Sequence, residues 1–240
     1  MRTARAETDQ VVVWLFVNPT QFGEGEDFER YPRSFERDEA LARKEGVDVL
    51  LAPSVEEIYP RPGSTIHVPV VTSHWEGLLR PGHFDGVATI VCKLLNIVRP
   101  DVAYFGLKDL QQCQVVTRMV EDLNIPVRIS LQPTVRDTDG LALSSRNVYL
   151  TDEERRLAPM IFRQLTTCKE LLQSGIKSRQ NIDDLLRHSR CALEDGGFHV
   201  DYFELVDLES MHSVRACTKP SAIIVAARLG RTRLIDNILL

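Results

Sequence analysis

The sequence predicts an α/β protein, in which a domain built on a mainly parallel β-sheet is followed by a smaller α+β domain. Up to residue 147, short β-branched and aromatic runs alternate with amphipathic segments of helical length. These apolar runs are continuous, as is typical of parallel strands that are covered on both faces. From residue 148 onward, helical segments come first and alternating strand segments follow. We therefore expect two domains, at residues 1–147 and 148–240.

Each element of the first domain has a local signal. The strands are apolar runs that end at Pro, Gly or an Asn-Pro turn, and they lie at 10–17, 47–53, 101–106 and 125–133, with a further extended piece at 65–71. The helix at 34–46 begins at Ser34, carries Arg43 and Lys44 in its last turn and ends at Gly46. Apolar residues at helical spacing predict two more helices, at 85–100 and 108–124.

The second domain is expected to start with two amphipathic helices, at 151–175 and 178–197. Three strands of an antiparallel sheet should follow, at 198–207, 221–230 and 232–240.

Composition narrows the function classes. The 240 residues carry 29 basic and 34 acidic side chains, a net charge of −5, which disfavours nucleic acid as a partner because its phosphates demand a basic surface. The five cysteines stand singly, so we expect them to be reduced and mostly buried. The sequence shows neither a secretory signal nor an apolar run long enough to cross a membrane, and we expect a cytoplasmic protein.

Polar residues follow several predicted strands, at the sheet edge where α/β proteins bind ligands. Gln21 comes after the first strand, and its amide could bind a hydroxylated substrate or could belong to an ordinary Asn-Pro turn. Arg80 and His83 precede a helix whose first amides attract anions, so they suit a carboxylate or a phosphate. The alternative is that both are solvated side chains of a Pro-Gly loop.

The segment "FGLKDLQQ" is a stronger candidate. Gly106 allows close approach of a ligand, Lys108 can contact a phosphate, and Asp109 can accept from ribose hydroxyls or cap the helix. Gln112 lies one helical turn further and can face the same site.

In "DGLALSSRNVYL", the hydroxyls of Ser144 and Ser145 and the guanidinium of Arg146 could hold phosphate oxygens. The alternative is a double cap on the next helix. Together these segments favour a site for a nucleotide polyphosphate and a small anion, although neither a P-loop nor a dinucleotide-binding glycine motif is present.

Long segments of the chain resemble the pantothenate synthetase (pantoate–β-alanine ligase) family of nucleotidyltransferases. They include "FVNPTQF", "EGLLRPGHFDGVATIV", "KLLNIVRPDVAYFGLKDLQQ", "DGLALSSRNVYL" and "RLIDN". The resemblance implies a Rossmann-like parallel sheet of the nucleotidyltransferase type with a small C-terminal lid domain. It also implies an AMP-forming ligase that activates pantoate with ATP and Mg²⁺ and joins it to β-alanine, and a homodimeric assembly.

The resemblance also assigns roles to single residues. Gln21 and Gln112 resemble the glutamines that hold pantoate, and Lys108, Arg146 and His83 would be the catalytic residues. The ATP site would be formed by Gly106, Leu107, Lys108, Asp109, Leu143, Ser144, Ser145 and Arg146, with a backbone contact from Val135 to adenine.

The chain departs from the family at its start. The family's first strand and its P-T-M-G-x-L-H-x-G-H loop have no counterpart here, so we expect a piece of a longer protein or a misplaced start. If the 240 residues are the whole product, we expect low stability and slow adenylation. A pantoate- and nucleotide-binding remnant without turnover is one alternative, and a synthetase-like protein acting on tRNA is a weaker one.

Overall fold

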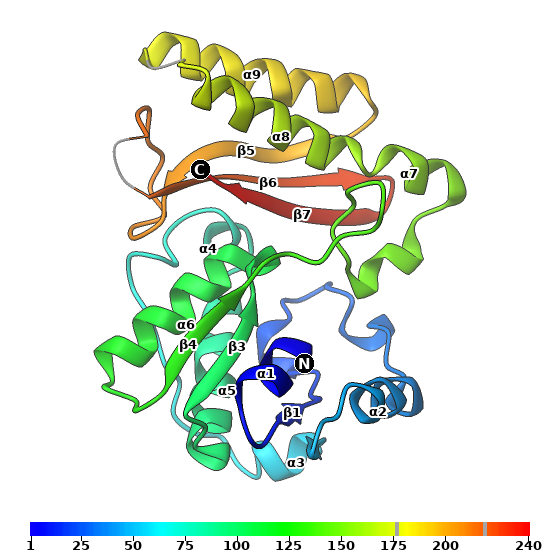
Figure 1. Cartoon of the computed structure of the whole chain (residues 1–240), viewed down its shortest axis with the longest axis vertical. Coiled ribbons are helices and arrows are strands. Elements are labelled where there is room, and N and C mark those ends of the chain that lie inside the picture. The colour runs from blue at the N-terminus through cyan, green and yellow to red at the C-terminus, as the bar shows by residue number, and fades with distance from the viewer. Residues whose placement is uncertain (176–177, 218–219) are drawn as a thin grey trace. The chain divides into compact units, whose positions relative to one another are not determined.

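The computed structural model describes residues 1–175, 178–217 and 220–240, which form two compact units. The first unit contains Met1–Val68, Arg80–Tyr104 and Val115–Ser130, and the second contains Pro69–Leu79, Phe105–Gln114 and Leu131–Leu240. The mixed α/β class is confirmed (Figure 1). Each unit is a group of residues in mutual contact and consists of several chain segments. The predicted domain boundary after Asn147 therefore stays a prediction.

The first unit holds most of the predicted alternation of strands and helices. Its elements are α1 (Arg2–Glu7), β1 (Val12–Trp14), the 3-10 helices η1 (Pro19–Gln21) and η2 (Phe28–Arg30), α2 (Phe35–Lys44), β2 (Val49–Leu51), α3 (Val55–Ile58) and α5 (His83–Val98). Three elements have residues in both units, namely β3 (Val102–Gly106), α6 (Leu110–Asp122) and β4 (Arg128–Gln132).

Two separate two-stranded sheets are found in this part of the chain. β1 pairs with β2 in parallel, as predicted, and β3 pairs with β4. Val12 and Val49 are partners across the first ladder, and they are 36% and 51% exposed. The expectation that these strands are covered on both faces is therefore wrong at this position.

Two local expectations in this region need correction. Ser34 does precede α2, but its side chain makes no capping hydrogen bond. Residues 65–71 form no strand in the described structure, and they span the boundary between the two units along the chain.

The second unit is built on an antiparallel sheet, as predicted. The sheet consists of β5 (His199–Asp207), β6 (Ser221–Leu229) and β7 (Thr232–Leu239), in that order. The unit also contains α4 (Glu76–Leu79), η3 (Leu107–Asp109), η4 (Ser145–Tyr149), α7 (Asp152–Leu157), α8 (Met160–Gln173) and α9 (Arg179–Asp195). The helices α8 and α9 pack side by side against this sheet (Figure 1).

The core of the second unit lies between these helices and the sheet. Leu165, Leu193, Leu205 and Ile223 are among its fully buried residues. β6 is buried at all but one of its residues, so the alternating burial expected for a sheet with one solvated face does not hold for this central strand. The helix predicted at 151–175 is two helices, because Pro159 cannot continue the backbone hydrogen bonds of α7.

Trp75 ties the Pro69–Leu79 segment to the same unit. Its indole Nε1 donates to the carbonyl oxygen of Met211 at 2.7 Å, and its ring lies 5.2 Å from that of Tyr202. Tyr202 in turn donates to Glu76 at 2.8 Å, which fixes the tyrosine ring against the indole.

The cysteines are all free, and two of them contradict the expected burial. Cys113 and Cys168 are buried and Cys92 is half-buried, but Cys191 and Cys217 are exposed. Across the described residues, every helix is too short or too polar to cross a membrane.

Candidate functional site

In the first unit, Asn18 fixes the short helix that carries Gln21. Its side-chain oxygen accepts hydrogen bonds from the Thr20 amide and hydroxyl and from the Tyr59 hydroxyl. Its amide nitrogen donates to the Gly86 carbonyl at 3.1 Å and to the Gln21 side chain at 3.4 Å. The Asn-Pro turn interpretation is therefore correct for η1, and the same turn holds Gln21 in one place. Whether Gln21 binds a substrate stays a prediction.

Arg80 and His83 both contact the backbone of Gln21. The Nδ1 atom of His83 lies 2.8 Å from the Gln21 carbonyl oxygen, so this nitrogen carries the proton and donates. Nε2 faces Arg80 Nη1 at 3.1 Å and accepts from it, because a guanidinium can only donate. His83 is 7% exposed. The alternative that the two side chains are solvated is wrong, and their contacts support Gln21.

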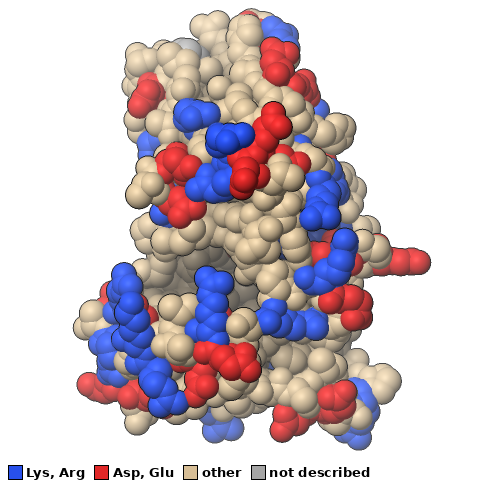
Figure 2. All heavy atoms as spheres, turned by 90° about the vertical axis from the view of Figure 1, so that its right-hand side faces the viewer, with Lys and Arg blue, Asp and Glu red and all other residues tan. Residues whose placement is uncertain are grey.

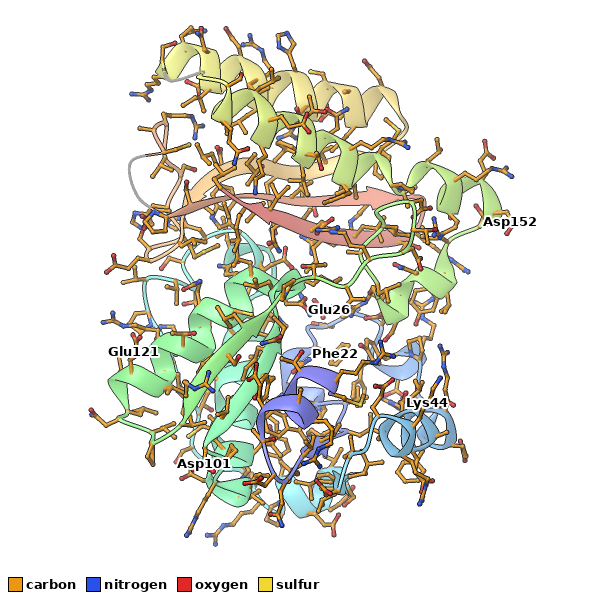
Figure 3. All side chains as sticks on the ribbon, in the orientation of Figure 1. Phe22, Glu26, Lys44, Asp101, Glu121 and Asp152 are labelled. Carbon is orange, nitrogen blue, oxygen red and sulfur yellow. The ribbon has the colours of Figure 1, made fainter. Side chains whose placement is uncertain are left out.

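Glu26, which no local sequence pattern singled out, completes this cluster. It lies on the loop between η1 and η2 and is labelled in Figure 3. Its carboxylate accepts from Arg80 Nε at 2.6 Å and from Nη2 at 2.7 Å, a two-point pairing. Burial alone would raise the pKa of Glu26, but the hydrogen bonds and the charge of Arg80 hold it below its ordinary value.

This pairing predicts a pH-dependent contribution to stability. A carboxylate with a lowered pKa in the folded state stabilises the protein above the unfolded-state pKa of 4.5, and the contribution is lost as the pH falls through the folded-state value. We expect Glu26→Gln to lower the free energy of unfolding by about 2 kcal/mol near pH 6. Denaturant titrations of both proteins from about pH 3 to about pH 7 should show the difference shrinking in acid, and a constant difference would contradict the assignment.

Gly86 lets helix α5 approach the backbone of η1 closely. A Cβ atom at this position would lie 2.3 Å from the Thr20 carbonyl oxygen and 2.8 Å from the Gln21 amide nitrogen. Backbone atoms cannot rotate away as a flexible side chain can. Glycine is therefore required at position 86, where α5 packs against the backbone of η1.

We expect Gly86→Ala to displace η1 and to lower the free energy of unfolding by about 1–3 kcal/mol. The matched control is Gly23→Ala, because a Cβ there would meet only the Glu26 side chain, at 3.8 Å. Thermal unfolding of the two variants checks this. Equal shifts in both would show that the close approach is not rigid.

In the second unit, the predicted Lys108 segment forms the turn between β3 and α6. Gly106 ends β3, Leu107 to Asp109 form η3, and α6 begins at Leu110. Lys108 Nζ lies 3.6 Å from the carboxylate of Asp109, and the two side chains are 20% and 46% exposed. Whether Lys108 contacts a phosphate stays a prediction.

Two residues of this region were not singled out from the sequence. Asn237 of β7 donates its side-chain amide to the carbonyl oxygens of Leu107 and Lys108, at 2.7 and 3.0 Å. Gln111 donates to the carbonyl oxygens of Val71 and His74, both at 2.8 Å. Both contacts join residues far apart in the chain, which no local pattern reports. Gln112, the neighbour of Gln111, is half-buried.

The predicted nucleotide residues Val135 and Leu143 begin and end a short hairpin loop, which an isolated β-bridge between Arg136 and Ala142 holds together. The Leu143 amide donates to the Val135 carbonyl oxygen at 2.9 Å, and both side chains are exposed. Arg136 anchors the hairpin, because its guanidinium contacts both carboxylate oxygens of Asp236, at 2.5 and 2.8 Å. It also donates to the Gly140 carbonyl oxygen and covers the ring of Phe162.

Ser144 performs the capping role considered for it. Its hydroxyl oxygen accepts from the Arg146 amide at 3.3 Å and caps η4, while Thr151 caps the following α7. Ser145 is exposed and Arg146 is half-buried. The capping interpretation thus holds for one of the two serines. Phosphate binding by Ser144, Ser145 and Arg146 stays a prediction.

On the face drawn in Figure 2, acidic and basic side chains are interspersed, and they do not form a basic stripe. Among the described residues, no group of three or more His, Cys, Asp or Glu side chains could hold a metal ion.

Comparison with known proteins gives one consistent result. The family model described as pantoate-beta-alanine ligase matches residues 1–239. A pantothenate synthetase from Roseiflexus castenholzii is 48% identical over 243 residues, covering 100% of this chain and 86% of the relative. One from Aquifex aeolicus is 48% identical, covering 99% and 84%.

Solved structures agree with the sequence relatives. The pantothenate synthetase of Thermus thermophilus superposes with a TM-score of 0.94 at 47% identity, covering 99% of this chain and 86% of its own. The pantoate-beta-alanine ligase of Francisella tularensis, complexed with beta-gamma ATP and beta-alanine, has a TM-score of 0.78 at 33% identity, covering 99% and 82%.

Proposed function

The chain belongs to the pantoate–β-alanine ligase family, and on that premise we propose that it joins pantoate to β-alanine in an ATP-dependent, AMP-forming reaction. The observation that carries the proposal is the match of the family model to residues 1–239. The relative complexed with beta-gamma ATP and beta-alanine supports the same two substrates.

The chemistry runs in two steps. The pantoate carboxylate forms a bond to the α-phosphorus of ATP, the bond to the bridging oxygen breaks, and pyrophosphate leaves. The unprotonated amine of β-alanine then bonds to the activated carbonyl carbon, the bond from that carbon to the phosphate oxygen breaks, AMP leaves, and the nitrogen releases one proton. Neither step requires a covalent bond to the protein, so the residues act by positioning the substrates and by stabilising developing charge.

We assign the predicted residues to these steps. Lys108 and Arg146 would neutralise charge on the phosphates, and Asp109 would accept from the ribose. Gly106 and Leu107 would lie against the nucleotide, and Val135 would contact adenine through its backbone. Leu143, Ser144 and Ser145 would bind the phosphates together with Arg146, and we call residues 143–146 the phosphate loop. Gln21 and Gln112 would bind pantoate.

His83 remains a candidate catalytic residue on the family resemblance, and its contacts favour an indirect action. Its two ring nitrogens contact Gln21 and Arg80, so His83 would fix the position of Gln21. Its effect would then appear mainly in the affinity for pantoate.

Three further properties follow as proposals. Mg²⁺ would enter as the complex with ATP and take most of its ligands from the phosphates and water, which suits the lack of a three-ligand cluster among the described residues. A homodimer is proposed on the family resemblance. Cytoplasmic location is supported by the five free thiols.

The test is pantoate-dependent exchange of labelled pyrophosphate into ATP, followed by formation of AMP and the amide when β-alanine is added. The proposal expects exchange without β-alanine and product only with it. Binding of ATP and pantoate by calorimetry without exchange would favour the non-catalytic binding remnant. Salt-sensitive binding of tRNA without exchange would favour the synthetase-like alternative.

A further inference from the structure

Two adjacent residues of β7, Asp236 and Asn237, each contact a different segment of the proposed nucleotide site. Both are 5% exposed. Asn237 donates to the carbonyl oxygens of Leu107 and Lys108, whereas Asp236 holds Arg136 of the Val135–Leu143 hairpin. All of these residues belong to the second unit.

β7 is a rigid base for these contacts. Asp236 and Asn237 pair with Val225 and Ile224 in the ladder with β6, the buried central strand. The Asn237 backbone amide also donates to the Asp236 carboxylate at 2.8 Å, which orients that carboxylate. β7 can therefore hold the Lys108 turn and the Val135–Leu143 hairpin in fixed positions.

The hydrogen bonds from the Asn237 side chain to the Lys108 turn go to backbone atoms of that turn. One side-chain amide group bonds two successive carbonyl oxygens of η3, so it fixes the plane of the peptide that carries the Lys108 side chain. Rotation of that peptide would swing the Lys108 ammonium away from its place. Asn237 can thus control the position of Lys108 without touching a ligand.

Asp236 acts on the second segment through Arg136. The Arg136 guanidinium, held at two points by Asp236, also donates to the Gly140 carbonyl oxygen and to that of Asn237. The hairpin runs directly into Ser144, Ser145 and Arg146. The start of the phosphate loop and the Lys108 turn are therefore anchored to two adjacent residues of the same strand.

We propose that Asp236 and Asn237 are positioning residues that hold the Lys108 turn and the base of the phosphate loop in a fixed relation for ATP binding. The inference rests on the proposed function for its purpose, and on the contacts within the second unit for its geometry. A misplacement of about 1 Å can cost about 100-fold in a positioned reaction, so two hydrogen-bonded anchors suffice for a large effect.

The first measurement is hydrogen exchange of the backbone amides. Asn237→Asp keeps the shape of the side chain but removes both donors, and Asp236→Asn removes the charge that pairs with Arg136. We expect Asn237→Asp to speed exchange of amides between residues 107 and 112, and Asp236→Asn to speed exchange in the Val135–Leu143 hairpin. Uniformly faster exchange throughout the unit would indicate a merely structural role and overturn the proposal.

The second measurement is calorimetric titration with Mg·ATP. Asn237→Asp should weaken binding of ATP by about tenfold or more, and Asn237→Ala serves if the aspartate variant does not fold. The control is Thr232→Val, in the same strand, because the buried Thr232 hydroxyl has no hydrogen-bond partner among the described residues. It should bind ATP as the parent protein does.

The results of this titration distinguish a failure of the positioning role from a failure of the proposed function. A parent protein that binds ATP, with both β7 variants within about threefold of it, would overturn the positioning role alone. A parent protein that binds no ATP would contradict the proposed function and the purpose assigned to Asp236 and Asn237 with it.

Discussion

Replacement of Lys108 by alanine is expected to slow pantoate-dependent exchange of pyrophosphate into ATP by about 100- to 1,000-fold, the usual effect of removing one group that stabilises developing charge. The side chain is 20% exposed, and its ammonium lies 3.6 Å from the carboxylate of Asp109. The loss should appear chiefly in the rate, because Lys108 is proposed to act where phosphate charge develops.

The same variant has two controls. Lys108→Arg keeps the charge but changes its geometry, and it should recover part of the lost rate. Lys44→Ala removes a charge from the end of α2, labelled in Figure 3, and should leave exchange unchanged. If Lys108→Ala exchanged pyrophosphate as fast as Lys44→Ala, the assignment of Lys108 would be wrong.

Replacement of Arg233 by leucine is expected to lower the free energy of unfolding by about 3–5 kcal/mol, as does removal of one partner from a buried ion pair. The guanidinium donates to both oxygens of Glu76 at 2.7 Å and to Asp201 at 2.7 Å. Burial alone would lower the pKa of Arg233, but these carboxylates raise it above its ordinary value. In the variant, the Glu76 carboxylate would stay buried without this cation.

Denaturant unfolding of three variants tests this expectation. Arg118→Leu removes an exposed pair with Asp122 and should cost no more than about 1 kcal/mol. The double variant Glu76→Leu with Arg233→Leu should be more stable than Arg233→Leu alone, because neither charge of that pair remains in the interior. A loss in Arg233→Leu no larger than that in Arg118→Leu would show that the network is solvated.

Local signals explain which parts of the fold were predictable. The β-branched runs, the charge gradient of α2 and the apolar spacing of α5 act within a few residues, and each produced the expected element. Pro159 was visible in the sequence, but the apolar pattern on both sides concealed the break between α7 and α8. Residues 65–71 have the composition of a strand but form none in the described structure. A strand needs a partner strand, and the partner is set by residues far away in the chain, which local composition does not report.

Local signals also led to two members of the candidate site, and the roles of both stay predictions. Lys108 and Gln112 were singled out because they follow an apolar strand and start a helix, and both signals are local. Glu26 and Asn237 were missed because their contacts are with partners 54 and 130 residues away. Ser144 was singled out as one of a pair of adjacent hydroxyls; its oxygen also caps η4, and its phosphate contact stays a prediction.

The position of the two tryptophans gives each compact unit its own optical reporter. Trp14 closes β1 in the first unit, and Trp75 packs on Tyr202 in the second. The sequence contains only these two indoles, so replacing either one by phenylalanine leaves emission from a single known location. The unfolding of the β1–β2 region and of the sheet around Tyr202 could then be followed as separate signals within one polypeptide.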